Sequence, residues 1–86
     1  MEMIQSVPNL STRRQDPALV SLGDAIRSMR ISKDISQEGL ALLAGVDRSY
    51  VGRVERGDNN VAVLTLIKIA HAMNVTVAEL MMEAAL

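Results

Sequence analysis

Apolar residues recur at intervals of three and four between residues 17 and 32. The recurring positions are Leu19, Leu22, Ile26 and Met29. This spacing places them on one side of an amphipathic helix. Asp16 can cap that helix and Pro17 suits its first position, so we expect it to run from there to about Ser32. Gly23 interrupts it and lowers its stability by up to about 1 kcal/mol relative to Ala.

Four shorter helices are predicted beyond the first, at residues 37–44, 47–56, 61–73 and 76 to the apolar end. Their starts carry capping side chains, and three stops carry a residue that tolerates a left-handed backbone. The predicted caps are Ser36, Asp47, Asn59 or Asn60, and Thr76 with Glu79, and the predicted stops are Gly45, Gly57 and Asn74. In the second helix, Leu40, Leu43 and Ala44 are expected to face inward. With no convincing strand, the fold class is all-α, a compact five-helix bundle.

Length and composition allow one domain at most. Residues 1–15 mix Pro, Asn, Ser and Thr without a sustained period, so we expect a flexible N-terminal arm followed by a domain at 16–86. The chain contains no Cys, no Trp and no Phe, which excludes disulfides and thiolate metal sites and leaves an aliphatic core. No signal-peptide core or membrane-spanning run is present, so we expect a cytoplasmic protein.

Charge is unevenly distributed along the chain, although the net charge is only −1. Residues 27–56 carry six basic and four acidic groups, whereas the segments on either side are net acidic. This asymmetry is compatible with an anionic partner at one face but is too small to establish one.

The third predicted helix separates its apolar and basic residues onto opposite sides. At 100° per residue, Tyr50, Val51 and Val54 form one compact stripe. The other side, between about 100° and 240°, carries the polar and basic residues of the helix. These are Arg48, Ser49, Gly52, Arg53 and Arg56. A solvated helix face is often charged, but this one lacks the acidic residues at i, i+4 spacing that would neutralise it.

Residues 37–56 also fit a helix-turn-helix register, with Ala41 at the close crossing and Gly45 in the turn. Together with the stretches SQEGLA, GVDRSYVGRVERG and LIKIAHAMNVTVAEL, the register makes the chain resemble the Xre/Cro-type helix-turn-helix DNA-binding domains of bacterial and phage repressors. The resemblance covers about Leu22 to Leu80. It implies a bundle of the phage-repressor type, with residues 47–56 as the recognition helix in the DNA major groove.

Carried over by position, the resemblance assigns roles to individual residues. Base contacts would come from Arg48, Ser49 and Arg53. Phosphate contacts would come from Gln37, Arg56, Asn59 and Asn60, whereas Tyr50 would either pack at the rim or touch a phosphate. Arg30 and Glu55 match a family ion pair that joins the first and third helices.

Three positions depart from the family pattern. Gly39 stands where a Glu usually completes a capping box, and Asp58 follows the recognition helix where Lys or Arg is frequent. Leu64 replaces a residue that is commonly charged. These departures suggest a less stable second helix and modest DNA affinity per monomer.

A homodimer would offset modest affinity, because two subunits can read two half-sites of a palindromic operator. The expected interface consists of Leu64, Met81, Met82, Ala85 and Leu86. The alternative is an antitoxin or controller-type autoregulator whose main role is to bind a protein partner that the sequence does not identify. No enzyme, cofactor or metal site is predicted, because His71 has no second ligand at metal-binding spacing and no nucleophile is paired with a base.

Overall fold

Five α-helices and no strand make up residues 15–86, the part of the chain that the computed structural model describes. The helices are α1 (Pro17–Ser32), α2 (Gln37–Ala44), α3 (Arg48–Glu55), α4 (Val63–Ala72) and α5 (Val77–Glu83). The all-α class and the number of helices agree with the prediction. The predicted arm, with its Arg13 and Arg14, lies outside the described residues, except for Gln15.

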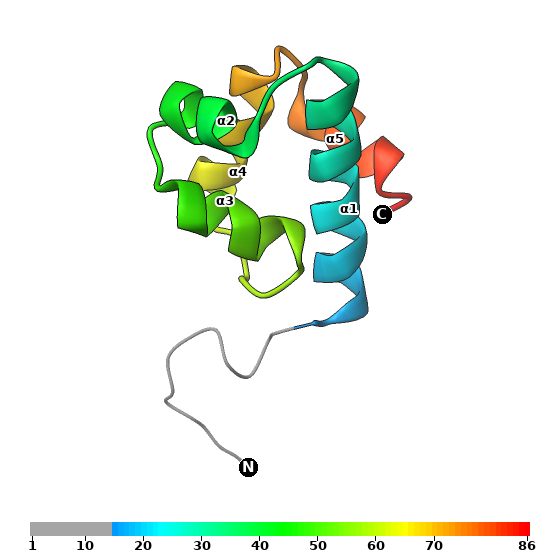
Figure 1. Cartoon of the computed structure of the whole chain (residues 1–86). Helices are drawn as coiled ribbons and strands as arrows, with labels where there is room; N and C mark the ends of the chain where they lie inside the picture. Colours follow the sequence, from blue (N-terminus) through cyan, green and yellow to red (C-terminus); the bar gives the residue numbers. More distant parts are fainter. Residues whose placement is uncertain (1–14) are drawn as a thin grey trace.

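The helices form two groups joined by α4 (Figure 1). α2 and α3 pack together on one side, and α1 packs against both α3 and α5. α4 lies behind α2 and contacts α5 as well. Within residues 15–86 no single helix has the length and apolar content to cross a membrane; α4 and α5 meet both criteria only as a pair, bent by 88°.

Most of the helix boundaries follow from the predicted capping residues. The Asp16 carboxylate accepts a hydrogen bond from the Ala18 amide at 2.9 Å, and Ser36 Oγ accepts one from the Gly39 amide at 2.8 Å. Thr76 forms the predicted capping box with Glu79 at the start of α5. The stops are also confirmed, since Gly45, Gly57 and Asn74 all have positive φ.

One predicted helix start was wrong, and one predicted cap lacks its side-chain hydrogen bond. Asp47 occupies the N-cap position of α3, but its side chain makes no capping hydrogen bond. α4 begins at Val63, not at Val61, and Ala62 takes the N-cap position in place of either asparagine. Residues 58–62 stay non-helical, and Val61 packs against the core from this segment.

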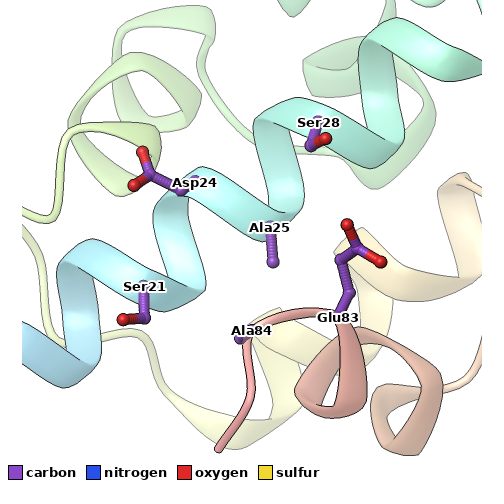
Figure 2. A pocket seen from close by; sticks show the side chains of 6 residues that line it. All are labelled: Ser21, Asp24, Ala25, Ser28, Glu83 and Ala84. Atoms are coloured by element: carbon purple, nitrogen blue, oxygen red, sulfur yellow. The ribbon is translucent and has the colours of Figure 1, made fainter.

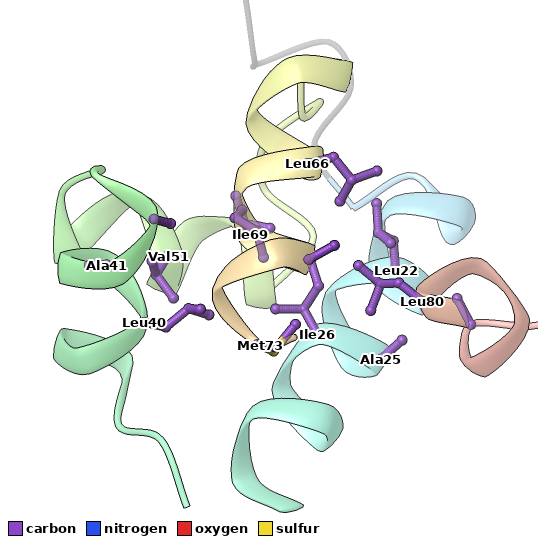
Figure 3. Packing of buried hydrophobic residues seen from close by; sticks show 14 residues of the cluster. Leu22, Ala25, Ile26, Leu40, Ala41, Val51, Leu66, Ile69, Met73 and Leu80 are labelled. Atoms are coloured by element: carbon purple, nitrogen blue, oxygen red, sulfur yellow. The ribbon is translucent and has the colours of Figure 1, made fainter. Parts of the chain in front are cut away.

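The core is aliphatic, as the composition predicts, and it is built around α4 (Figure 3). Every helix contributes, and the most deeply buried large side chains are Ile26, Leu40, Val51, Ile69, Met73 and Leu80. The prediction for Leu43 was wrong, because this side chain is 63% exposed. α2 buries Leu40, Ala41 and Ala44, so its inward face follows the i, i+1, i+4 pattern and turns Leu43 to solvent.

Gly23 lies where α1 passes closest to α3. A Cβ at this position would stand 2.6 Å from the Glu55 carbonyl oxygen and closer still to that of Val54. Both are backbone atoms that cannot rotate away. The glycine in the middle of α1 is therefore required by the helix contact, although it weakens α1 taken alone.

Candidate nucleic-acid interface

α3 presents a basic face to solvent and buries its opposite, apolar face. Val51 and Val54 are 1% and 2% exposed, respectively, whereas Arg48 and Ser49 are exposed and Arg53 is half-buried. Arg56 caps the C-terminal end of the helix and is exposed. The three residues expected to contact bases are thus all solvent-accessible on the helix that follows the Gly45 turn.

Gly52 was expected on the exposed strip, but it is buried. A Cβ on this residue would lie 3.3 Å from Arg56 Nη1 and 3.9 Å from Gln37 Oε1. Two side chains expected to contact phosphate, one from α2 and one from the end of α3, therefore converge over a residue that has no side chain.

Tyr50 and Arg53 interact on the same side of α3. The Arg53 guanidinium carbon lies 5.8 Å from the centre of the Tyr50 ring, a cation–π distance. Burial raises the pKa of the Tyr50 phenol, whereas a hydrogen bond with Thr65 of α4 and the positive charge of Arg53 act in the opposite direction. The Tyr50 phenol is therefore neutral near pH 7, and its ring lies beside the Arg53 guanidinium at the rim of the exposed face.

Arg30 of α1 and Glu55 of α3 form the expected ion pair. Arg30 Nε donates to Glu55 Oε2 at 2.6 Å, and Arg30 Nη2 donates to Oε1 at 3.1 Å. Both residues are buried, at 8% and 5% exposure. Arg30 Nη1 also donates to the Ile35 carbonyl at 2.8 Å, so one guanidinium joins α1, α3 and the turn before α2.

Gln37, the first residue of α2, is connected to this ion pair. Its Nε2 donates to Glu55 Oε1 at 3.0 Å. No sequence pattern predicted this contact. One of the two N–H bonds of the Gln37 amide is used internally, which fixes the direction of the side chain and leaves the second N–H for an external acceptor.

The segment after α3 is held by Gln15 and Asp58. Asp58 Oδ2 accepts a hydrogen bond from Arg56 Nε at 3.1 Å, and Asp58 Oδ1 accepts one from Gln15 Nε2 at 2.6 Å. The backbone N–H of Gln15 donates to the Gly57 carbonyl at 2.7 Å. Gln15, the last residue of the predicted arm, is therefore fixed beside the C-terminal end of α3.

The two asparagines in this segment differ in exposure. Asn60 is exposed, whereas Asn59 is half-buried and its Oδ1 is enclosed without a hydrogen-bonding partner among residues 15–86. Both asparagines come directly after Asp58 in the sequence. The structure thus brings the expected phosphate contacts Gln37, Arg56, Asn59 and Asn60 to one end of the α2–α3 unit or to the segment that follows it.

A shallow groove of about 290 Å³ lies between α1 and α5 (Figure 2). It is lined by Ser21, Asp24, Ala25, Ser28, Glu83 and Ala84. Its charged side chains are acidic, one from each helix, and no basic residue lines it. This groove therefore does not suit a polyanion, in contrast to the exposed face of α3.

The residues expected at a dimer interface are mostly exposed. Leu64, Met82 and Leu86 are 75%, 78% and 58% exposed, Ala85 is exposed, and Met81 is half-buried. The polypeptide leaves α5 before its last residues, since Ala85 has φ of 59°. Sequence reasoning missed four further exposed apolar side chains: Ile31, Leu42, Leu43 and Val63.

The arrangement of α2, the Gly45 turn and α3 corresponds to a known family model. The model described as Helix-turn-helix matches residues 26–80. The chain belongs to the helix-turn-helix family. This membership confirms the helix-turn-helix DNA-binding domain inferred from the sequence.

Several relatives in this helix-turn-helix family are control proteins. Over 60 residues, the chain is 43% identical to control protein C.SmaI of Serratia marcescens, which covers 70% of this chain and 71% of the relative. Control protein C.BamHI of Bacillus amyloliquefaciens is 37% identical over 60 residues, with coverage of 69% and 74%. The predicted class, a DNA-binding regulator, agrees with these relatives.

Solved structures share the fold. The restriction-modification controller protein C.AhdI from Aeromonas hydrophila is 48% identical, with a TM-score of 0.71 over 72% of this chain and 94% of that one. The clp gene regulator ClgR from Corynebacterium glutamicum is 34% identical, with a TM-score of 0.78 over 79% and 87%. The five-helix arrangement is thus common to regulators of two kinds.

Proposed function

We propose that the protein is a sequence-specific, double-stranded DNA-binding regulator of the controller type, which acts as a homodimer. α3 enters the major groove, with Arg48, Ser49 and Arg53 at base edges. The observation that carries this proposal is the exposed basic face of α3. The buried ion pair between Arg30 and Glu55 holds this helix against α1. Arginine suits this role because its guanidinium can bond guanine O6 and N7 with two donors.

The phosphate contacts are assigned to the first residue of α2 and to the end of α3 with the segment that follows it. Gln37 donates its second amide N–H to one phosphate, and its direction is set by Glu55. Arg56, Asn59 and Asn60 approach the backbone after α3, and the Tyr50 hydroxyl lies at the rim. These contacts fix register and orientation without reading sequence.

The dimer is assigned to the exposed apolar residues of α5 and to Leu64 of α4. Three of the five residues expected there, Leu64, Met82 and Leu86, are large apolar side chains that are mostly exposed. A cluster of exposed apolar side chains on a small protein is typical of an interaction surface. A two-fold symmetric dimer presents two copies of α3 to a palindromic operator. A mass that stays monomeric over a wide concentration range in sedimentation would refute this assignment.

The relatives favour a controller-type regulator over an antitoxin. The matched proteins include several named as control proteins, whereas no feature of residues 15–86 points to a toxin partner. Since its target is DNA, we place the protein with the chromosome in the cytoplasm.

Two substitutions test the roles of α2 and α3. Arg48→Ala is expected to relax base preference at one half-site position, by about 1–3 kcal/mol of discrimination. Gln37→Ala is expected to weaken binding to every duplex alike, because a phosphate contact carries no sequence information. Lys68→Ala, which removes a positive charge from the exposed side of α4, is the matched control. If Arg48→Ala and Gln37→Ala both left affinity for a selected operator intact, the assignment would be wrong.

A further inference from the structure

Arg56 differs from the other two arginines of the α3 region in having an internal anion beside it. Its Nε lies 3.1 Å from Asp58 Oδ2, and its side chain is 62% exposed whereas that of Asp58 is only 14% exposed. Arg48 and Arg53 form no ion pair with any residue in the described part of the chain. The guanidinium at the end of α3 thus faces solvent on one side and a nearly covered carboxylate on the other.

The Asp58 carboxylate is held in place independently of Arg56. Gln15 Nε2 donates to its other oxygen at 2.6 Å and also to the Arg56 carbonyl at 2.8 Å. The Asp58 amide donates to the Arg53 carbonyl at 2.9 Å, so backbone and side chain are both fixed to the end of the recognition helix. A carboxylate fixed in this way keeps its position whether or not Arg56 stays paired with it.

We propose that Asp58 is an internal substitute for a DNA phosphate: it holds Arg56 in the free protein and gives it up to the phosphate backbone on binding. The proposal rests on the proposed function, since it concerns the phosphate contact assigned to Arg56. A carboxylate and a phosphate oxygen accept the same charge-assisted hydrogen bonds from a guanidinium. The exchange lowers affinity for every duplex, because the bond between Arg56 and Asp58 must break before the guanidinium can bind a phosphate.

The expected size of the effect follows from the exposure of the pair. Because Arg56 is largely exposed, removing the competing Asp58 carboxylate should raise affinity by about twofold to fivefold per protomer. Two protomers bind together, so the factors multiply to about fourfold to twenty-five-fold for a dimer. Specific and random duplexes gain equally, since phosphate contacts carry no sequence information, and the ratio of the two affinities stays constant.

The test is a double-mutant cycle on the full chain, with Asp58→Asn, Arg56→Ala and the combined variant. Binding to a selected operator and to a random duplex is measured by fluorescence anisotropy between about 50 and 300 mM salt. Asp58→Asn keeps an oxygen that can accept the Gln15 hydrogen bond. The control is Asp24→Asn, which removes the same charge from an exposed position of α1, a helix assigned neither to DNA contact nor to the dimer.

The result we expect is tighter binding of Asp58→Asn to both duplexes and a steeper dependence on salt, by up to about one unit per protomer. In the Arg56→Ala background the same substitution should change affinity by less than about twofold, and Asp24→Asn should do the same in the wild-type chain. Should Asp58→Asn lower the melting temperature, Asp58→Ser is compared by the same criteria.

Two results would overturn the proposal. One is unchanged or weaker binding by the folded Asp58 variants. The other is an equal gain with and without Arg56, which would mean that the carboxylate merely repels DNA. Failure of the wild-type chain to bind any duplex would instead refute the proposed function, and the inference with it.

Discussion

Replacing Gly23 by Ala should destabilise the protein, although the same change stabilises most helices. The new methyl carbon would stand 2.6 Å from the Glu55 carbonyl oxygen. A carbon–oxygen contact normally needs about 3.3 Å, so α1 and α3 must separate by at least about 0.7 Å, and by more to clear the nearer Val54 carbonyl oxygen. The oxygens belong to the backbone of the last turn of α3, and only a movement of a whole helix can relieve the contact.

The magnitude is set by two opposing terms. Ala gains about 1 kcal/mol of helix propensity over Gly. Against this, overpacking costs about 1–3 kcal/mol, and the same separation stretches the buried hydrogen bonds of 2.6 and 3.1 Å between Arg30 and Glu55. Weakening a buried pair costs up to about 3–5 kcal/mol, so we expect a net loss of about 2–4 kcal/mol. A domain of this size has only about 4–11 kcal/mol in total.

The assay is urea unfolding followed by far-UV circular dichroism, at one fixed protein concentration because a dimer would make stability concentration-dependent. Gly39→Ala is the matched control. Its Cβ would meet only the Ser36 hydroxyl at 3.1 Å and an Ile35 methyl at 3.5 Å, both of which are side-chain atoms. We expect Gly39→Ala to be neutral or stabilising by up to about 1 kcal/mol. A Gly23→Ala protein as stable as the wild type would refute the close-approach argument.

Three further changes test the contacts that fix the interface. Glu55→Ala should cost about 3–5 kcal/mol in urea unfolding, because Arg30 is left buried without its partner; a loss below about 1 kcal/mol would contradict a buried pair. Thr76→Ala should cost about 1 kcal/mol through loss of the capping box, with an equal loss expected in Glu79→Ala if the two act together. Tyr50→Phe should lower stability by about 0.5–1.5 kcal/mol through loss of its hydrogen bond with Thr65, and an unchanged unfolding midpoint would argue against that bond.

Sequence patterns predicted the features that depend on neighbouring residues. The boundaries of α1 follow from apolar spacing and from Asp16, and the start of α5 follows from the capping box of Thr76 and Glu79. The left-handed stops at Gly45 and Asn74 were equally local. In each case the stabilising contacts join residues only a few positions apart, so a short stretch of sequence is enough to predict the helix end.

Features that depend on distant residues were harder to predict. Leu43 lies on a helix of only two turns, where periodicity cannot decide which side faces the core. Asn59 and Asn60 look like caps, yet Val61 packs against the core and Ala62 takes the extended N-cap conformation before α4.

The candidate site shows the same division. The exposed arginine face followed from helical geometry, and the Arg30–Glu55 pair from family resemblance. The bonds of Asp58 with Gln15, 43 residues away, and of Gln37 with Glu55, 18 residues away, have no local signature. Only the fold brings these groups together. It places Gln37 beside Glu55 and Asp58 beside Arg56 around the exposed arginines of α3.

Selection of bound sites from random duplex DNA, at about 150 mM salt, tests the central claim most directly. If the exposed side of α3 reads bases, the selected sites should contain two symmetric half-sites with centres about 10–10.5 base pairs apart. A guanine that is enriched by the wild-type protein should lose its enrichment with Arg48→Ala. A folded protein that retains duplexes without any sequence enrichment would contradict the account.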